Sequence, residues 1–282
     1  MTSFLQDMLS RYEIKNVKDE ENAIKEILQE CILCELSKAG FFEHAIFCGG
    51  TALRIFYHLD RFSEDLDFSL EVPQKDFSIE KYLQKIKGSM QQYGINLEVD
   101  LKKQRTAVQS AFLKVNTIQQ FLLFEASFDS NIFRKDEKIK IKIEIDTNPP
   151  EGGTFEFKRG ILPSLYSVRI FDKSSLFAGK IHSILCRFWD NRVKGRDLYD
   201  FIFYVRGRTP INLTFVENAM KQSGHLGSSD SLTIEKLKAL LKDKFNTLDY
   251  ELAKKDVRPF VNNQKEIELW DKDLFVELVD ML

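Results

Sequence analysis

The chain has 282 residues, a length that suits one large domain or two modest ones. A hydrophobic fraction of 43%, with 12% aromatic residues, is ample for a packed core and argues against long disordered stretches. The formal net charge of −2 excludes a uniformly cationic surface, so any contact with nucleic acid has to come from a local basic patch.

The N-terminal segment carries charges early and lacks the apolar stretch of a signal peptide. The sequence has no apolar run of about 18 residues, which argues against a membrane span. Cys31 and Cys34 form a C-x-x-C pair, but they fall within a helical pattern and no second ligand pair follows at zinc-site spacing. We therefore expect a cytoplasmic protein whose cysteines stay reduced.

The first elements alternate between helix and strand. Residues 19–39 have the pattern of an amphipathic helix, and residues 41–48 that of a buried strand. This strand ends at Gly49-Gly50, where the backbone can turn tightly, and Thr51 is suited to cap the helix that follows. Residues 66–70 alternate as a short strand.

Further elements follow up to a composition shift near residues 160–172. Before this shift we expect a helix over 78–93 and strands over 95–101, 110–115, 121–128 and 139–147. A short strand follows, and then a helix capped between Asp172 and Ser175. After a connector over 191–195 we expect only helices, from 196 and around 214–223, 231–245, 248–255 and 265–281. The pattern predicts an α+β fold, with a mixed sheet and flanking helices over 1–165 and a mainly helical domain over 166–282.

The turn at Gly49-Gly50-Thr51 precedes a helix start. Backbone N–H groups there can be approached closely, because glycine has no Cβ, and this makes a cradle for phosphate. A Gly-Gly turn before a helix is more often only a tight connector, so the motif is weak by itself.

Asp65 and Asp67 stand two residues apart at the start of the 66–70 strand. Residues at this spacing point to one face, so the two carboxylates converge and suit a magnesium or manganese ion. Two solvated acids at a strand end are the alternative. Glu144 and Asp146 share one face of the Ile-rich strand, and an antiparallel neighbour of the Asp65–Asp67 strand would bring one of them to the same site.

Lys180 and Arg187 lie on one face of a predicted helix. Lys180 is suited to offset the charge of a leaving pyrophosphate, although a solvated lysine is the ordinary alternative. Asp197 and Asp200 are three residues apart and could instead orient Lys180, Arg187 or Arg196 through salt bridges.

Two segments have a surplus of basic residues. One runs from Lys180 to Arg208 and includes aromatic residues, and the other runs from Arg134 to Lys142 beside the candidate third acid. Phosphate contacts and aromatic stacking are the usual ingredients of an RNA-binding surface. Charge runs are also common as solvated faces, so both interpretations stay open.

Four blocks in this order resemble one known family. They are residues 49–54 (GGTALR), 61–68 (RFSEDLDF), 180–187 (KIHSILCR) and 194–200 (KGRDLYD). They are similar to the AbiEii/AbiGii toxin family of nucleotidyltransferases, which is related to the MenT toxins and belongs to the DNA polymerase β-like superfamily. The resemblance covers roughly residues 40–205.

The resemblance implies a polymerase β-like N-terminal domain, with the C-terminal domain completing the nucleotide and acceptor cleft. The metal ion would be Mg²⁺ or Mn²⁺, held by Asp65, Asp67 and Asp146, with Glu144 open as the third acid. The catalytic residues implied are Asp65, Asp67, Asp146, Lys180 and Asp197. The nucleotide-binding residues implied are Gly49, Gly50, Thr51, Arg61, Ser63, Lys180 and Arg187.

The function implied is metal-dependent transfer of a nucleotide from an NTP to an acceptor hydroxyl. The expected acceptor is tRNA, and the expected setting is a toxin–antitoxin or abortive-infection system with a cognate antitoxin protein. Two alternatives stay open. They are transfer to a small molecule or a protein side chain, and a non-catalytic protein that only binds nucleotides.

Overall fold

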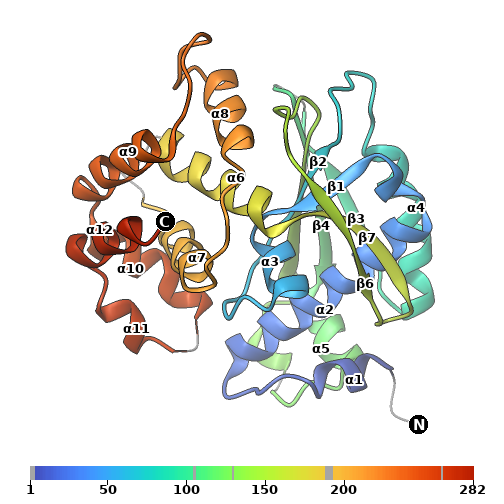
Figure 1. Ribbon diagram of the computed structural model, residues 1–282. Helices are drawn as coiled ribbons and strands as arrows, with labels where there is room; N and C mark the ends of the chain where they lie inside the picture. Colours follow the sequence, from blue (N-terminus) through green and yellow to red (C-terminus); the bar gives the residue numbers. More distant parts are fainter. Residues whose placement is uncertain (1–3, 104–105, 129, 188–192, 262) are drawn as a thin grey trace. The chain divides into compact units, whose positions relative to one another are not determined.

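The computed structural model describes residues 4–103, 106–128, 130–187, 193–261 and 263–282 (Figure 1). The chain divides into two compact units. The first unit comprises residues 1–52, 63–149 and 157–170, and the second comprises residues 53–62, 150–156 and 171–282. Neither unit is continuous in sequence, because the chain passes between them several times.

A seven-stranded mixed sheet forms the first unit, apart from strand residues 155–156 and 171. Its strands are β1 (Ala45–Cys48), β2 (Leu66–Leu70), β3 (Glu98–Leu101), β4 (Val108–Asn116), β5 (Lys138–Asp146), β6 (Phe155–Gly160) and β7 (Tyr166–Phe171). They are arranged in the order β3-β4-β5-β2-β1-β7-β6. The predicted mixed sheet with flanking helices is therefore confirmed.

The central strand β2 has one antiparallel and one parallel neighbour. It runs antiparallel to β1 and parallel to β5. Our expectation that the strand carrying Glu144 and Asp146 would be an antiparallel neighbour was wrong. A parallel pair needs a long crossover, and the chain between β2 and β5 supplies it, with α4 (Glu80–Met90), β3, β4 and α5 (Thr117–Leu123) in between.

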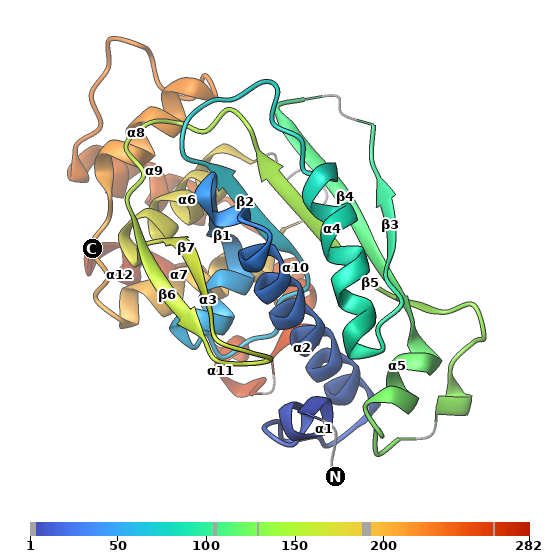
Figure 2. The same cartoon turned by 90° about the vertical axis from the view of Figure 1, so that its right-hand side faces the viewer.

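Helices cover one face of this sheet. They are α2 (Val17–Lys38) and α4 (Glu80–Met90), which lie side by side along the sheet in Figure 2. The isoleucines of β5 are buried on that side, at positions 139, 141, 143 and 145. Aromatic rings fill the adjoining core, with Phe41 and Phe68 4.9 Å apart between centroids. The other face of β2 and β5 therefore carries their polar side chains.

The remaining short elements of the first unit differ in part from the sequence expectation. They are α1 (Phe4–Leu9), η1 (Phe41–Glu43), η2 (Gln91–Tyr93), α5 (Thr117–Leu123) and η3 (Ser130–Ile132). Residues 41–43 form a 3-10 turn, so only the second half of the predicted 41–48 strand is extended.

The strand expected over 121–128 was wrong, because residues 117–123 form α5. Asn116 caps this helix by accepting a hydrogen bond from the Gln119 amide, and Thr117, Gln120 and Phe121 are buried at helical spacing. The edge strand β6 was not predicted. Its residues show no buried face, since Phe157 is 68% exposed, and a strand without one lacks the alternation that sequence reading depends on.

The second unit is helical. Its helices are α6 (Lys173–Cys186), α7 (Gly195–Arg206), α8 (Leu213–Gln222), α9 (Ile234–Asn246), α10 (Tyr250–Val257), η4 (Arg258–Phe260), α11 (Lys265–Glu268) and α12 (Lys272–Asp280). Helix α3 (Gly49–Tyr57) starts in the first unit and continues in the second. The single helix expected over 265–281 is two, because Asp271 caps a new start by accepting from the Leu274 amide.

An aromatic core holds the second unit together. Phe177 stacks on Tyr204 with ring centroids 4.5 Å apart, and Phe201 meets Phe245 at 5.1 Å. Within the described ranges, no helix combines the length and the apolar character that crossing a membrane requires.

Candidate active site

Gly49 lies directly against Asp67. Its φ is +77°, and a Cβ added to it would stand 2.3 Å from Asp67 Oδ2. Only glycine combines this backbone conformation with such a close approach. Helix α3 begins here, ahead of Thr51, which the sequence predicted as its cap. The Asp67 carboxylate therefore packs directly against the backbone of Gly49.

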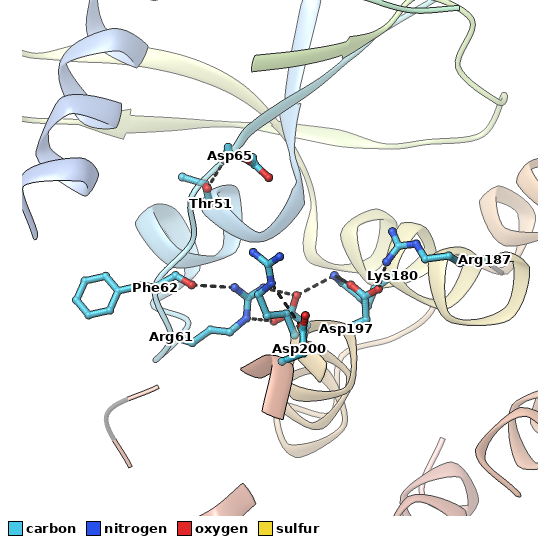
Figure 3. Close-up of polar contacts among 10 residues, drawn as sticks. Thr51, Arg61, Phe62, Asp65, Lys180, Arg187, Asp197 and Asp200 are labelled. Carbon is cyan, nitrogen blue, oxygen red and sulfur yellow. Dashed lines mark hydrogen bonds and ion pairs between the residues drawn. The ribbon is translucent and has the colours of Figure 1, made fainter. Parts of the chain in front are cut away.

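Thr51 is fully buried inside helix α3 and is not its cap. Its hydroxyl donates to the backbone carbonyl of Asp65, as Figure 3 shows. The expectation of a capping threonine was thus wrong, since the side chain serves a segment far along the chain. The bond fixes the chain of Asp65 at the entrance to β2.

The register of β2 and β5 brings the predicted acids to one face. Asp67 is directly opposite Glu144, and Ser69 is opposite Asp146. Cross-strand partners point to the same side of a sheet, so Asp67, Glu144 and Asp146 share a face. Cys48 is opposite Asp67 on β1 and belongs to this face as well.

Glu144 and Asp146 differ in their surroundings. The Glu144 carboxylate is paired with Lys142 at 2.7 Å. Asp146 accepts a hydrogen bond from the Asn148 amide, and burial raises the pKa of its carboxyl. Burial, followed by the charges of Asp67 and Asp146, raises the pKa of the Cys48 thiol.

The donor set of this face fits a hard divalent cation in chemistry, since Asp65, Asp67 and Asp146 offer only carboxylate oxygens. The side chains are not gathered into a finished site. No group of three or more His, Cys, Asp or Glu side chains stands ready to hold a metal ion in the part of the chain that the structure describes. A metal would have to draw these oxygens together.

The second unit contains a chain of alternating buried charges (Figure 3). Arg61 donates to Asp200 through Nε and Nη2, each at 2.7 Å, and a third donor, Nη1, reaches the Phe62 carbonyl at 2.9 Å. The side chains of Arg61 and Asp200 are 3% and 0% exposed. Three Arg61 donors thus have protein partners, and the contact with the nucleotide that the resemblance implies stays a prediction.

Lys180 continues this chain of charges. Its Nζ lies 2.6 Å from Asp197 and 2.8 Å from Asp200. Asp197 also pairs with Arg187 at 2.5 Å. Burial opposes the charge on Lys180, but the two carboxylates hold its pKa above the ordinary value. Burial by itself would raise the pKa of Asp197, but the charges of Lys180 and Arg187 hold this pKa below the usual range.

Gly195 starts α7 within the K-G-R-D block, and sequence reasoning assigned it only to a connector. A Cβ there would stand 1.8 Å from the Ala253 carbonyl oxygen, so glycine is needed for α7 to pack on α10. Residues 191 and 192 of that expected connector lie outside the described residues. Lys194 precedes this glycine, and burial, together with the charge of Arg187, lowers the pKa of its amine.

Comparison with known proteins decides which family this arrangement represents. The model of the nucleotidyl transferase AbiEii toxin family, of type IV toxin–antitoxin systems, matches residues 31–277. The chain belongs to this family. It is therefore a nucleotidyltransferase toxin, and the family implies an antitoxin partner.

Two solved structures share the fold of this AbiEii chain. MenT4, a nucleotidyltransferase toxin of Mycobacterium tuberculosis, is 13% identical, with a TM-score of 0.62 over 98% of this chain and 88% of its own. JHP933 of Helicobacter pylori is 21% identical, with a TM-score of 0.52 over 93% of this chain and 90% of its own. No curated protein sequence matches the chain.

The predicted site residues thus fall into two groups. Gly49, Thr51, Asp65, Asp67 and Asp146 lie together in the first unit. The second group, in the other unit, consists of Arg61, Lys180, Arg187 and Asp197, joined by Asp200. Ser63 is half-buried in the first unit, where its carbonyl accepts from Gln29. Their roles as metal, nucleotide and catalytic residues stay predictions.

Proposed function

We propose that this toxin transfers a nucleotide from an NTP to an acceptor hydroxyl of tRNA and depends on Mg²⁺ or Mn²⁺. One observation carries the proposal. The parallel register of β2 and β5 sets Asp67 and Asp146 on one face of the sheet, to which Cys48 of β1 also belongs. Carboxylates that share one face of a sheet can supply the oxygen ligands that a hard divalent cation prefers, so the arrangement favours a divalent metal.

Asp65, Asp67 and Asp146 would hold the metal, which when bound would orient the triphosphate and offset its negative charge. Gly49 leaves the backbone open on the side of Asp67, because a side chain at this position would displace the carboxylate. Thr51 fixes Asp65 through its carbonyl. The chain's own contribution is therefore mainly positioning.

Lys180 would contact the triphosphate, as the family resemblance implies. An ammonium group has three donors, and Asp197 and Asp200 occupy two of them. The third donor remains for a phosphate oxygen. Asp197 and Asp200 then act as positioning residues, since they keep Lys180 charged and aimed although it is buried.

Transfer of label tests the proposal. The protein is incubated with Mg²⁺, total tRNA and each labelled NTP in turn, beside an Asp67→Asn variant. Asp76→Asn is the matched control, because Asp76 is an exposed turn residue of the same unit. We expect label in tRNA with wild type and control, none with Asp67→Asn, and loss on adding EDTA that excess Mg²⁺ reverses.

Two results would contradict the proposal. Full transfer by Asp67→Asn would remove this carboxylate from the reaction, and full transfer in EDTA would remove the metal. Label on protein or a small molecule instead of RNA would point to a different acceptor for the same centre. Growth arrest on expression, relieved by Asp67→Asn and not by Asp76→Asn, would tie the toxicity to the activity.

A further inference from the structure

Strand β5 carries a row of lysines that leads to the proposed metal site. Lys138, Lys140 and Lys142 alternate with the buried isoleucines, so they occupy the same face as Glu144 and Asp146. At about 3.3 Å per residue, Lys140 lies about 13 Å from Glu144 along the strand. The three lysines and the two acids therefore form one row along this face of β5.

The neighbouring strand β4 adds a fourth lysine. Lys114 is directly opposite Lys140, and Phe112 is opposite Lys142. Like charges facing each other across an antiparallel pair destabilise a sheet. Lys140 has no ion-pair partner among the residues described, whereas Lys114 is paired with Asp100 at 2.7 Å. The charge of Lys140 is therefore not offset by a carboxylate within the described residues.

The lysines border a hollow. A depression of about 510 Å³ is lined by Lys114, Lys138 and Lys140, together with Arg134, Asp136 and Glu137. Three of the four lining cations are paired, Arg134 with Asp136, Lys114 with Asp100 and Lys138 with Glu98, so Lys140 supplies the positive charge that no described carboxylate offsets. Phe112 is half-exposed on this face, and the Lys102 amine lies 5.1 Å from its ring centroid.

We propose that this lysine face (Lys114, Lys138, Lys140 and Lys142) binds backbone phosphates of the acceptor RNA, with the strand running along β5 toward Asp67 and Asp146. Lysines two residues apart on one strand stand about 6.6 Å from each other, which suits successive phosphates of an extended strand. Phe112 offers a surface on which a base can stack. This inference rests on the proposed function and assigns the surface that recognises the substrate.

Three lysines of this face already have carboxylate partners: Lys138 pairs with Glu98, Lys114 with Asp100 and Lys142 with Glu144, all partly exposed. Lys138 is paired with Glu98 at 2.6 Å, and both side chains are partly exposed, at 32% and 60%. Exposed pairs of this kind contribute only about 0–1 kcal/mol, so a phosphate can replace the carboxylate at little cost. Neutralised phosphates also release counterions, which favours binding further.

The test separates binding from transfer. Affinity for a labelled single-stranded RNA is measured by fluorescence anisotropy across a salt series, with EDTA present and no NTP. The variant is Lys114→Gln/Lys140→Gln. The control is Lys81→Gln/Lys85→Gln, which removes the same charge from exposed positions of α4, on the covered side of the sheet. Thermal melting checks that both variants are folded.

We expect the Lys114/Lys140 variant to bind about tenfold more weakly at low salt and to lose about 1.4 from the slope of log affinity against log salt. In transfer assays its KM for tRNA should rise while its KM for NTP stays unchanged. Equal affinity and slope in variant and control would overturn the inference even if tRNA is labelled. Weakened RNA binding by a protein whose wild type labels no RNA would overturn the proposed function and leave the lysine face as an RNA site.

Discussion

Arg61 and Asp200 form a bidentate ion pair between residues 139 positions apart, with both hydrogen bonds at 2.7 Å. The pair lies in the second unit and is almost completely buried. Arginine suits this position because its planar fork matches a carboxylate with two parallel bonds. The pair ties the segment before β2 to helix α7.

Asp200→Asn should destabilise the protein by about 3–5 kcal/mol, because Arg61 and Lys180 would remain buried without their shared carboxylate. Urea unfolding measures the loss. The control is Glu268→Gln, whose exposed pair with Arg258 should be worth at most about 1 kcal/mol. Equal losses in the two variants would show that the buried pair adds nothing.

The stability of the second unit should fall at acid pH through Asp197. Its folded pKa is depressed by Lys180 and Arg187 despite burial, so its contribution is present above the ordinary value of 3.8 and lost as pH falls below it. Urea midpoints of wild type and Asp197→Asn should therefore differ most near neutral pH and converge as pH falls from about 3.8 through the lower folded pKa of Asp197. A constant gap down to strong acid would argue against the charge as the cause.

Gly49→Ala should abolish most nucleotide transfer. A methyl group at a φ of +77° is strained by about 1–2 kcal/mol, and it has to displace the Asp67 carboxylate. We expect at least about a hundredfold loss in rate, because small displacements of a reacting centre cost that much. Transfer assays and thermal melting measure the two effects.

Gly88→Ala is the control for that substitution. Gly88 lies in helix α4 with open space around it, so alanine should stabilise the protein by about 0.5–1 kcal/mol without affecting transfer. If Gly49→Ala transferred label as fast as Gly88→Ala, the close approach to Asp67 would have no catalytic importance.

Thr51→Val should reduce both stability and activity, since valine matches the shape of threonine but cannot donate to the Asp65 carbonyl. A buried acceptor left without its donor costs about 1–3 kcal/mol. Thr51→Ser keeps the hydroxyl and should restore most of the transfer rate while leaving a small cavity. If Thr51→Ser and Thr51→Val were equally impaired, the methyl packing and not the hydroxyl would position Asp65.

The strands near the site were readable from the sequence because strand periodicity is local. The alternation of Ile143 and Ile145 with Glu144 and Asp146 predicts which side chains are buried. This prediction does not depend on which strand pairs with β5. The same alternation places Asp67 on the polar face of β2, whereas Asp65 precedes the strand. The family blocks then identified the enzyme class, which the AbiEii match confirms.

The local sequence pattern did not predict the correct element where tertiary packing decided the secondary structure. Residues 121–123 are apolar enough for a strand, but Asn116 caps a helix there and Phe121 is buried at helical spacing. Strand β6 has no buried face and so left no signal.

By itself the sequence determined which residue types stand at which spacing, and therefore the Gly-Gly-Thr motif, the candidate acids and the amphipathic elements that carry them. Only the tertiary structure decided that β2 runs parallel to β5, so that Asp67 faces Glu144 and shares a face with Asp146. It also decided that Arg61 forms its ion pair with Asp200. Periodicity acts over a few residues, whereas these pairings depend on which distant segments fold together, and that is settled by the packing of the whole chain.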